Sequence, residues 1–278
     1  MSITEAELVE HLKKLPPLPE PLQQVLRFLN DAQSNWAKIG TVMLKDPVLT
    51  GRVLQIANSS FYGLHRQVKD IEIACSVLGA ETLRGLVYTL ILLSKFRHGQ
   101  ENSVIDYDLL WRNSLRTACL VKKIARQSRQ DSTAAFTIGL FHLLDLIIQD
   151  YFFSDLLKER LKKYRTENSL AIDEKIHYLI DTEYWWLTAT LLEYWQFPEP
   201  IVSVFRQVPE ASASKTKAFI VVSNTILSSL GTDGKIPIDD ITNATTLFEE
   251  SGLSNVDFQE CVDDSEKLYH EMASGMFG

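Results

Sequence analysis

The spacing of apolar residues is the feature that most constrains how this chain folds. Along nearly the whole sequence they recur every third or fourth position, which places them on one face of a helix. Strands would instead show apolar and polar residues in alternation between short turns, and this pattern is missing. We therefore expect an all-α protein, and 278 residues are enough to bury a sizeable core.

Local signals predict where several of these helices begin and end. Ser2, with a glutamate three residues later, predicts a capping box for the first helix. Asp46 followed by Pro47 predicts an N-cap and a first helical position. Asp70 predicts the start of a further helix, and Gly79 predicts its end.

The most apolar run of the chain, residues 137–153, raises the question of a membrane helix. Polar side chains, among them His142 and Asp145, interrupt this run, so it lacks the roughly 18 consecutive apolar residues that spanning requires. We expect one continuous buried helix here and no contact with a membrane.

The N-terminus and the cysteines indicate the cytoplasm. The first residues carry neither the basic flank nor the apolar segment of a signal peptide. Cys75, Cys119 and Cys261 are far apart, each within an apolar helical pattern, as expected of buried thiols rather than of disulfides or a metal site.

The polar residues 98–103 predict a connection between two helical parts. We expect an N-terminal helical half over 1–100, a helical core over 104–235 and an acidic helical segment over 236–278. The last segment holds ten carboxylates and one lysine in a chain of net charge −8. Because such a segment repels phosphate backbones, we expect no nucleic-acid partner.

Motifs of common enzymes are absent from the sequence. It has no glycine-rich phosphate loop, no Gly-x-Ser-x-Gly elbow and no pair of histidines at metal-binding spacing on one helix. His142 differs from the other histidines because it lies in the most apolar run, with Asp145 one turn later. Two interpretations remain open: a metal ligand beside a carboxylate, or a core histidine whose ring Asp145 holds.

Seven motifs resemble the HDOD family, the HD-related output domains of bacterial signalling proteins. Four lie in the first half and three in the second, in the family's order: LPPLP (15–19), DPVLT (46–50), NSSFYG (58–63), ACSVLG (74–79), LWRNS (110–114), GLFH (139–142) and EYWQFP (193–198). The resemblance implies a multi-helix HD-like bundle with an N-terminal helical subdomain packed on it.

HD phosphohydrolases, the parent superfamily, bind divalent metals through scattered histidines and aspartates and direct metal-bound water at phosphoesters. The resemblance places other residues at most of these positions. The histidine–aspartate doublet is His142-Leu143, and Asp145 stands where a glycine is usual. The remaining former positions are Asn113, Tyr184, Arg206, Gln207 and Asn224. A catalytic metal needs about three protein ligands, so we expect no metal, no cofactor and no hydrolase activity.

Three functions fit this interpretation to different degrees. The preferred one is a non-catalytic module that transmits signals by binding other signalling proteins. The second is a residual metal-dependent phosphohydrolase acting on nucleotides or cyclic dinucleotides. The third is a nucleotide sensor without catalysis. Its phosphate contacts would come from a basic helix flank with Lys122, Arg126 and Arg129, or from Lys123 or Arg206.

Overall fold

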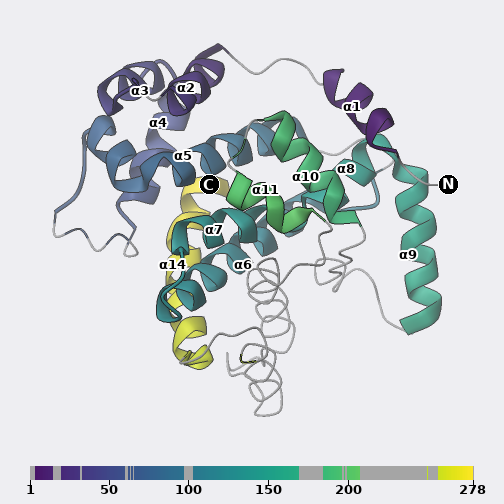
Figure 1. Ribbon diagram of the computed structural model, residues 1–278. Helices are drawn as coiled ribbons and strands as arrows, with labels where there is room; N and C mark the ends of the chain where they lie inside the picture. The colour runs from purple at the N-terminus through teal and green to yellow at the C-terminus, as the bar shows by residue number, and fades with distance from the viewer. Residues whose placement is uncertain are drawn as a thin grey trace. The chain divides into compact units, whose positions relative to one another are not determined.

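Helices make up every regular element among the residues that the structure describes, as the sequence predicts (Figure 1). The structure is a computed structural model, and it describes residues 4–14, 20–31, 33–59, 62, 64, 66–96, 103–168, 184–195, 197, 199–206, 249 and 256–277. The chain divides into two compact units. Unit 1 comprises Met1–Leu15 and His98–Asp263, and unit 2 comprises Pro16–Arg97 and Asp264–Gly278.

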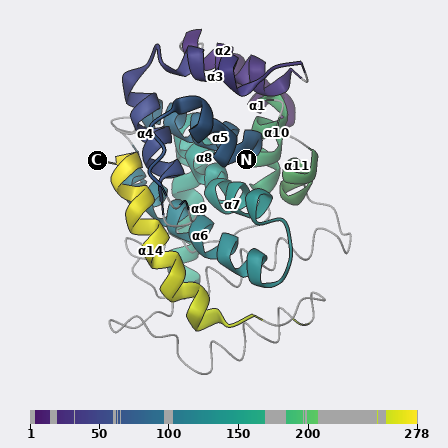
Figure 2. The same cartoon turned by 90° about the vertical axis from the view of Figure 1, so that its left-hand side faces the viewer.

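Unit 1 is built around the close packing of two neighbouring helices, α6 and α7, which lie side by side in Figure 2. A Cβ on Gly139 of α7 would lie 2.7 Å from the Cα of Ala118 on α6, so only glycine permits this approach. The helices of this unit are α1 (Glu5–Lys13), α6 (Tyr107–Gln127), α7 (Ser132–Phe141), α8 (Leu144–Phe152), α9 (Ser154–Asn168), α10 (Trp185–Tyr194), α11 (Glu199–Phe205) and the start of α14 (Phe258–Phe277).

A buried carboxylate joins α8 to the chain that leads into α6. Asp150, which is 2% exposed, accepts hydrogen bonds from the Ser103 hydroxyl at 2.6 Å and the Tyr107 hydroxyl at 2.7 Å. The main-chain N–H of Val104 donates to the same carboxylate at 3.1 Å. These donors offset the cost of burying the charge and fix residues 103–107 against α8.

Unit 2 contains α2 (Glu20–Asn30), α3 (Trp36–Met43), α4 (Pro47–Ala57), α5 (Ile71–Phe96) and the rest of α14. The predicted helix starts are confirmed: Asp46 accepts from the Leu49 N–H at 3.0 Å, and Asp70 accepts from the Glu72 N–H at 2.7 Å. Gly79 has a φ of 77° and interrupts α5, as expected of a helix-ending glycine.

Two local expectations were wrong. The first capping box pairs Thr4 with Glu7, so the helix begins two residues later than the Ser2 pattern predicts. The run 137–153 forms two helices, α7 and α8, because the ring of His142 bonds to the carbonyl that a continuous helix would pair with the N–H of residue 143.

Burial explains the apolar character of this run and of the cysteines. Ser132–Phe152 is long and apolar enough to cross a membrane by length and composition alone, but 83% of its most apolar 18-residue window is buried inside the protein. The three cysteines are free and buried, as expected, and burial raises the pKa of the Cys75 thiol to about 12.

Candidate functional site

The former HD positions on α7 and α8 lie inside unit 1. His142 ends α7, Leu143 precedes α8 and Asp145 is in the first turn of α8. All three are buried, with exposures of 1%, 1% and 3%. The site is therefore built at a break between two helices, and the break gives its side chains directions that a continuous helix would not.

The ring of His142 is oriented by the main chain. Its Nδ1 lies 2.7 Å from the carbonyl oxygen of Gly139. Because a carbonyl can only accept, Nδ1 carries a proton, and in the neutral form of the ring the lone pair is on Nε2. Metal-binding histidines commonly have this arrangement, in which one ring nitrogen bonds to a carbonyl and the other faces the metal.

Asp145 does not orient this Nδ1, contrary to one of the two interpretations of the sequence. Its Oδ2 accepts from the amide of Gln149 at 3.3 Å and lies 3.9 Å from a guanidinium nitrogen of Arg160. The same Arg160 nitrogen donates to the Gln149 side-chain oxygen at 3.0 Å. The Arg160 Cζ lies 4.3 Å from the ring centroid of Tyr184, another former HD position. We call these four residues the Arg160 cluster.

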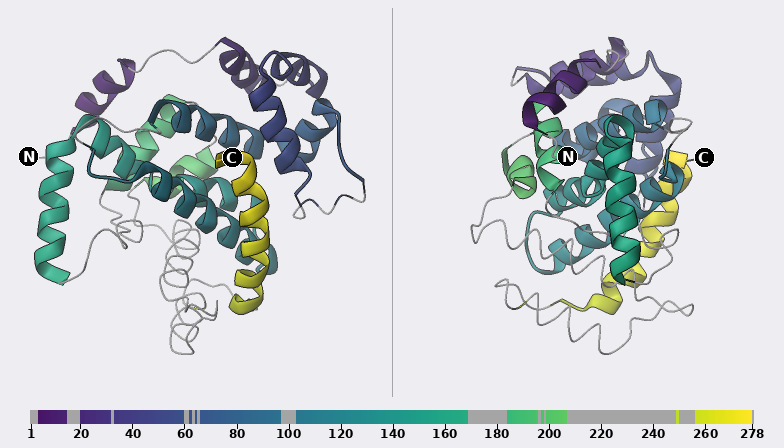
Figure 3. Two further views of the ribbon diagram at one scale, coloured as in Figure 1. Left: turned by 180° about the vertical axis from the view of Figure 1, so that it is seen from behind. Right: turned by 90° about the vertical axis from the view of Figure 1, so that its right-hand side faces the viewer.

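The turn between α8 and α9 brings Arg160 to this place. Phe153 alone separates the two helices, and the chain changes direction there (Figure 3). Its N–H donates to the Gln149 carbonyl at 2.8 Å, which closes α8. Helix α9 then packs on α8, so Arg160 faces the carboxylate of Asp145.

Charge compensation is the main consequence of the Arg160 cluster. A carboxylate as deeply buried as Asp145 is costly unless a cation or hydrogen-bond donors accompany it. Arg160 provides the positive charge, and the face of Tyr184 adds a favourable contact with the guanidinium. A divalent cation at Asp145 would have to approach against this fixed positive charge. Within the described part of the chain, no group of three or more His, Cys, Asp or Glu residues could hold a metal.

Asn113 and Arg206 are the other former positions that the structure describes, and neither is part of the Arg160 cluster. Asn113 is half-buried on α6, and its amide nitrogen has no hydrogen-bond partner among the described residues. Gln207 and Asn224 lie outside the described residues.

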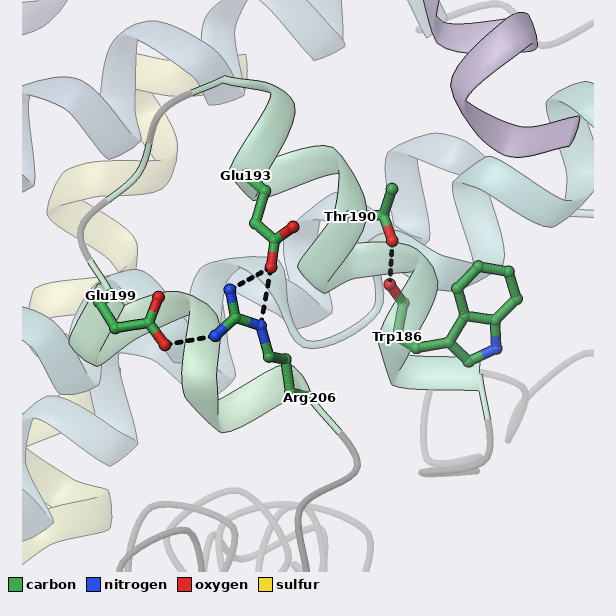
Figure 4. Close-up of polar contacts among 5 residues, drawn as sticks. All are labelled: Trp186, Thr190, Glu193, Glu199 and Arg206. Carbon is green, nitrogen blue, oxygen red and sulfur yellow. Dashed lines mark hydrogen bonds and ion pairs between the residues drawn. The ribbon is translucent and has the colours of Figure 1, made fainter. Parts of the chain in front are cut away.

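Arg206 is held by two carboxylates at the surface (Figure 4). Its Nε donates to Glu193 of α10 at 2.7 Å, and its two terminal nitrogens bond to Glu193 and to Glu199 of α11. The hydrogen bond to Glu193 is the main cause that raises the pKa of Arg206. A phosphate at this place would have to compete with both carboxylates, so the geometry is that of a clamp between α10 and α11.

The predicted basic flank of α6 is divided by burial. Lys122 is 3% exposed, and its ammonium lies 4.9 Å from the centroid of the Phe136 ring. Burial is the main cause that lowers the pKa of Lys122 to about 7. Arg126 is exposed on α6, whereas Arg129, also exposed, follows the end of the helix and has a φ of 57°. Phosphate binding through this flank stays a prediction, and its exposed part consists of these two arginines.

Sequence reasoning missed Arg160 and Gln149. Gln149 could have been found, since it is one turn after Asp145 on the same helix face. Arg160 could not, because α9 carries many charged residues and only the packing of α9 on α8 distinguishes this one.

Comparison with known proteins adds the family and the fold. The family model of the HDOD domain matches residues 15–210. An uncharacterized protein of Treponema pallidum is 20% identical over 248 residues, which are 87% of this chain but 47% of the relative. The chain thus spans about half the length of this curated relative.

Two solved structures share the fold. One, from Shewanella amazonensis and named a "Putative phosphohydrolase", has a TM-score of 0.66 at 21% identity and covers 97% of each chain. The other, from Marinobacter aquaeolei and named a "Putative signal transduction protein", has a TM-score of 0.64 at 21% identity, over 97% of this chain and 61% of that one. At these identities, the likeness extends to the all-helical fold and not to an activity.

Proposed function

Because the chain belongs to the HDOD family, we propose that it acts as a non-catalytic signal-transduction module that binds other proteins. The observation that carries this proposal is the position of Arg160 beside Asp145. Asp145 is the one carboxylate among the former HD positions, and a cation of the chain itself, rather than a metal ion, compensates its charge.

The chemistry of hydrolysis supports the same conclusion. Metal-dependent hydrolases need about three protein ligands and an open position for water. Leu143 offers no ligand atom where the superfamily has an aspartate, and Asp145 is engaged by Arg160 and Gln149. His142 alone would bind a divalent ion weakly. We therefore propose that the scaffold has kept its fold and exchanged metal chemistry for contacts with partners.

Several features are consistent with a signalling protein of the cytoplasm. The Marinobacter neighbour carries a signalling name. The three cysteines are separate buried thiols, as is usual in a reducing compartment. The partners that we propose are signalling proteins rather than nucleic acids, since the end of the chain is acidic.

A residual phosphohydrolase acting on nucleotides or cyclic dinucleotides is the second candidate. One observation favours it: the Nδ1 of His142 bonds to the Gly139 carbonyl, an arrangement in which the neutral ring would offer Nε2 to a metal. The name of the Shewanella neighbour suggests the same chemistry for that protein. A nucleotide sensor without catalysis, using Arg126 and Arg129, ranks below both because exposed arginine side chains are usually only solvated.

Metal analysis separates the first two candidates. The full chain is purified without chelator or metal-affinity tag, its iron, manganese and zinc are measured, and hydrolysis of bis(p-nitrophenyl) phosphate is assayed with each metal added. His142→Ala and Asp145→Ala are the matched variants. We expect less than about a tenth of an equivalent of metal and no hydrolysis. Near one equivalent, lost in both variants together with hydrolysis, would refute the non-catalytic proposal.

A further inference from the structure

Unit 2 contains a pocket of about 560 Å³ between α4, the residues before α5 and the α14 residue Glu271. Its volume is within the range of about 300–1,000 Å³ that is usual for ligand sites. None of its lining residues belongs to the Arg160 cluster or to a former HD position. It is therefore a second candidate site, in the other unit of the chain.

The wall of this pocket is fixed by Asn58, from the NSSFYG motif. Its side-chain nitrogen donates to the carbonyls of Val68 at 2.8 Å and Leu54 at 2.7 Å, and its oxygen accepts from the Val68 N–H at 2.7 Å. Both main-chain groups of Val68 are thus paired with one amide, as they would be with a neighbouring strand. The segment before α5 is held along the end of α4.

The residues on either side of Val68 leave main-chain groups available. Gln67 and Lys69 are exposed and line the pocket. Within the described part of the chain, their main-chain N–H and C=O groups make no hydrogen bonds. Exposed main-chain donors and acceptors of this kind are what an extended peptide pairs with when it binds along a protein segment.

Two other features cost the free protein stability without serving its own packing. Gly51 lies within α4, and glycine makes a helix less stable than alanine does. A Cβ at this position would nevertheless meet no atom within 4 Å. Ser59 is 5% exposed, and its hydroxyl has no hydrogen-bond partner among the described residues. Both residues line the pocket, so a bound molecule would use the space at Gly51 and could satisfy Ser59.

We propose that this pocket binds an extended peptide segment of a partner protein. The segment pairs its main chain with the main-chain groups of Gln67 and Lys69 and crosses α4 at Gly51. Lys69 and Glu271 have opposite charges, which favours a segment that carries both signs. This inference rests on the proposed function, since a module that acts through protein contacts needs a partner site.

The test uses the full chain and a phage-displayed library of random peptides of about six residues, the length of a typical strand. Peptides selected on the wild type are measured by fluorescence anisotropy against Gly51→Leu, which places a side chain in the pocket. Ala37→Leu is the matched control, because it introduces the same side chain at an exposed position of α3 outside the pocket. We expect Gly51→Leu to weaken binding at least about tenfold and the control to change it less than about twofold.

Circular dichroism verifies that Gly51→Leu is folded, and Ser59→Ala provides a second, smaller change in the same pocket, also expected to weaken binding. Failure to select any peptide, or selected peptides that bind Gly51→Leu as well as the wild type, would overturn the inference. The inference would also be overturned if the pocket bound only small molecules. The result would then be small-molecule binding that Gly51→Leu abolishes, with no peptide bound. Metal analysis is independent of this pocket, so a metal-free protein without peptide binding would refute only the peptide site.

Discussion

Replacing Lys122 with methionine should stabilise the protein at neutral pH, by an amount that falls as the pH rises. Lys122 is 3% exposed, and burial lowers its pKa from 10.5 to about 7. Methionine is of similar length and needs no hydration, so it fills the same space without the cost of a buried charge.

The expected magnitude follows from proton linkage. The unfolded chain keeps the ammonium proton up to its ordinary pKa of 10.5, whereas the folded chain loses it above a pKa of about 7. Between these values the unfolded state binds more protons, so the free energy of unfolding of the wild type rises with pH. With half of Lys122 protonated at about pH 7, the rise up to about pH 9 is about 2 kcal/mol. Below about pH 7 both states are charged, and this contribution stays constant.

Urea unfolding followed by circular dichroism at several pH values measures this directly. The stability advantage of Lys122→Met over the wild type should shrink by about 2 kcal/mol from about pH 7 to about pH 9. Lys38→Met, at an exposed lysine of α3, is the matched control. The pH dependence of its stability difference from the wild type is compared with that of Lys122→Met. An advantage that is flat over this range, or that grows with pH, would refute the reasoning.

Four further substitutions test the packing at two glycines and the Arg160 cluster. Gly139→Ala should lower the free energy of unfolding by about 2 kcal/mol or more, because its Cβ would lie 2.7 Å from the Cα of Ala118. Gly51→Ala, at a helical glycine with open space, should instead be neutral or stabilising by up to about 1 kcal/mol, and equal urea midpoints for the two would contradict this account. Arg160→Met should cost about 2–3 kcal/mol by leaving the Asp145 carboxylate buried without its cation. Adding Asp145→Asn should recover part of that loss, and a double variant no more stable than Arg160→Met alone would argue against the ion pair.

Three of the four local helix signals in the sequence gave a correct prediction, and Ser2 was the exception. Asp46, Asp70 and Gly79 act within a few residues of themselves, and each has the predicted role. The break between α7 and α8 was not predicted, because it depends on a bond from the His142 ring to the main chain. An apolar run gives no sign of such a bond, since its periodicity continues through the break.

The sequence predicted the candidate site only through its resemblance to the HDOD family, which identifies the former HD positions. It indicated His142, Leu143 and Asp145, which the structure brings together at one helix break. It did not indicate Arg160, whose role depends on the distance between side chains of two helices. Lys122 shows the same limit, because helical spacing placed it with Arg126 on a solvated flank, and packing against Phe136 buries it.

Gly139 connects two properties of unit 1, the distance between α6 and α7 and the direction of the His142 ring. Its missing side chain sets the distance between α6 and α7, and its carbonyl sets the direction of the His142 ring. Any larger residue would push the backbone away from α6 and carry the carbonyl with it. We therefore expect every substitution of Gly139 to disturb both the helix packing and the His142 ring. Related proteins with other residues around this ring should still have glycine at this position.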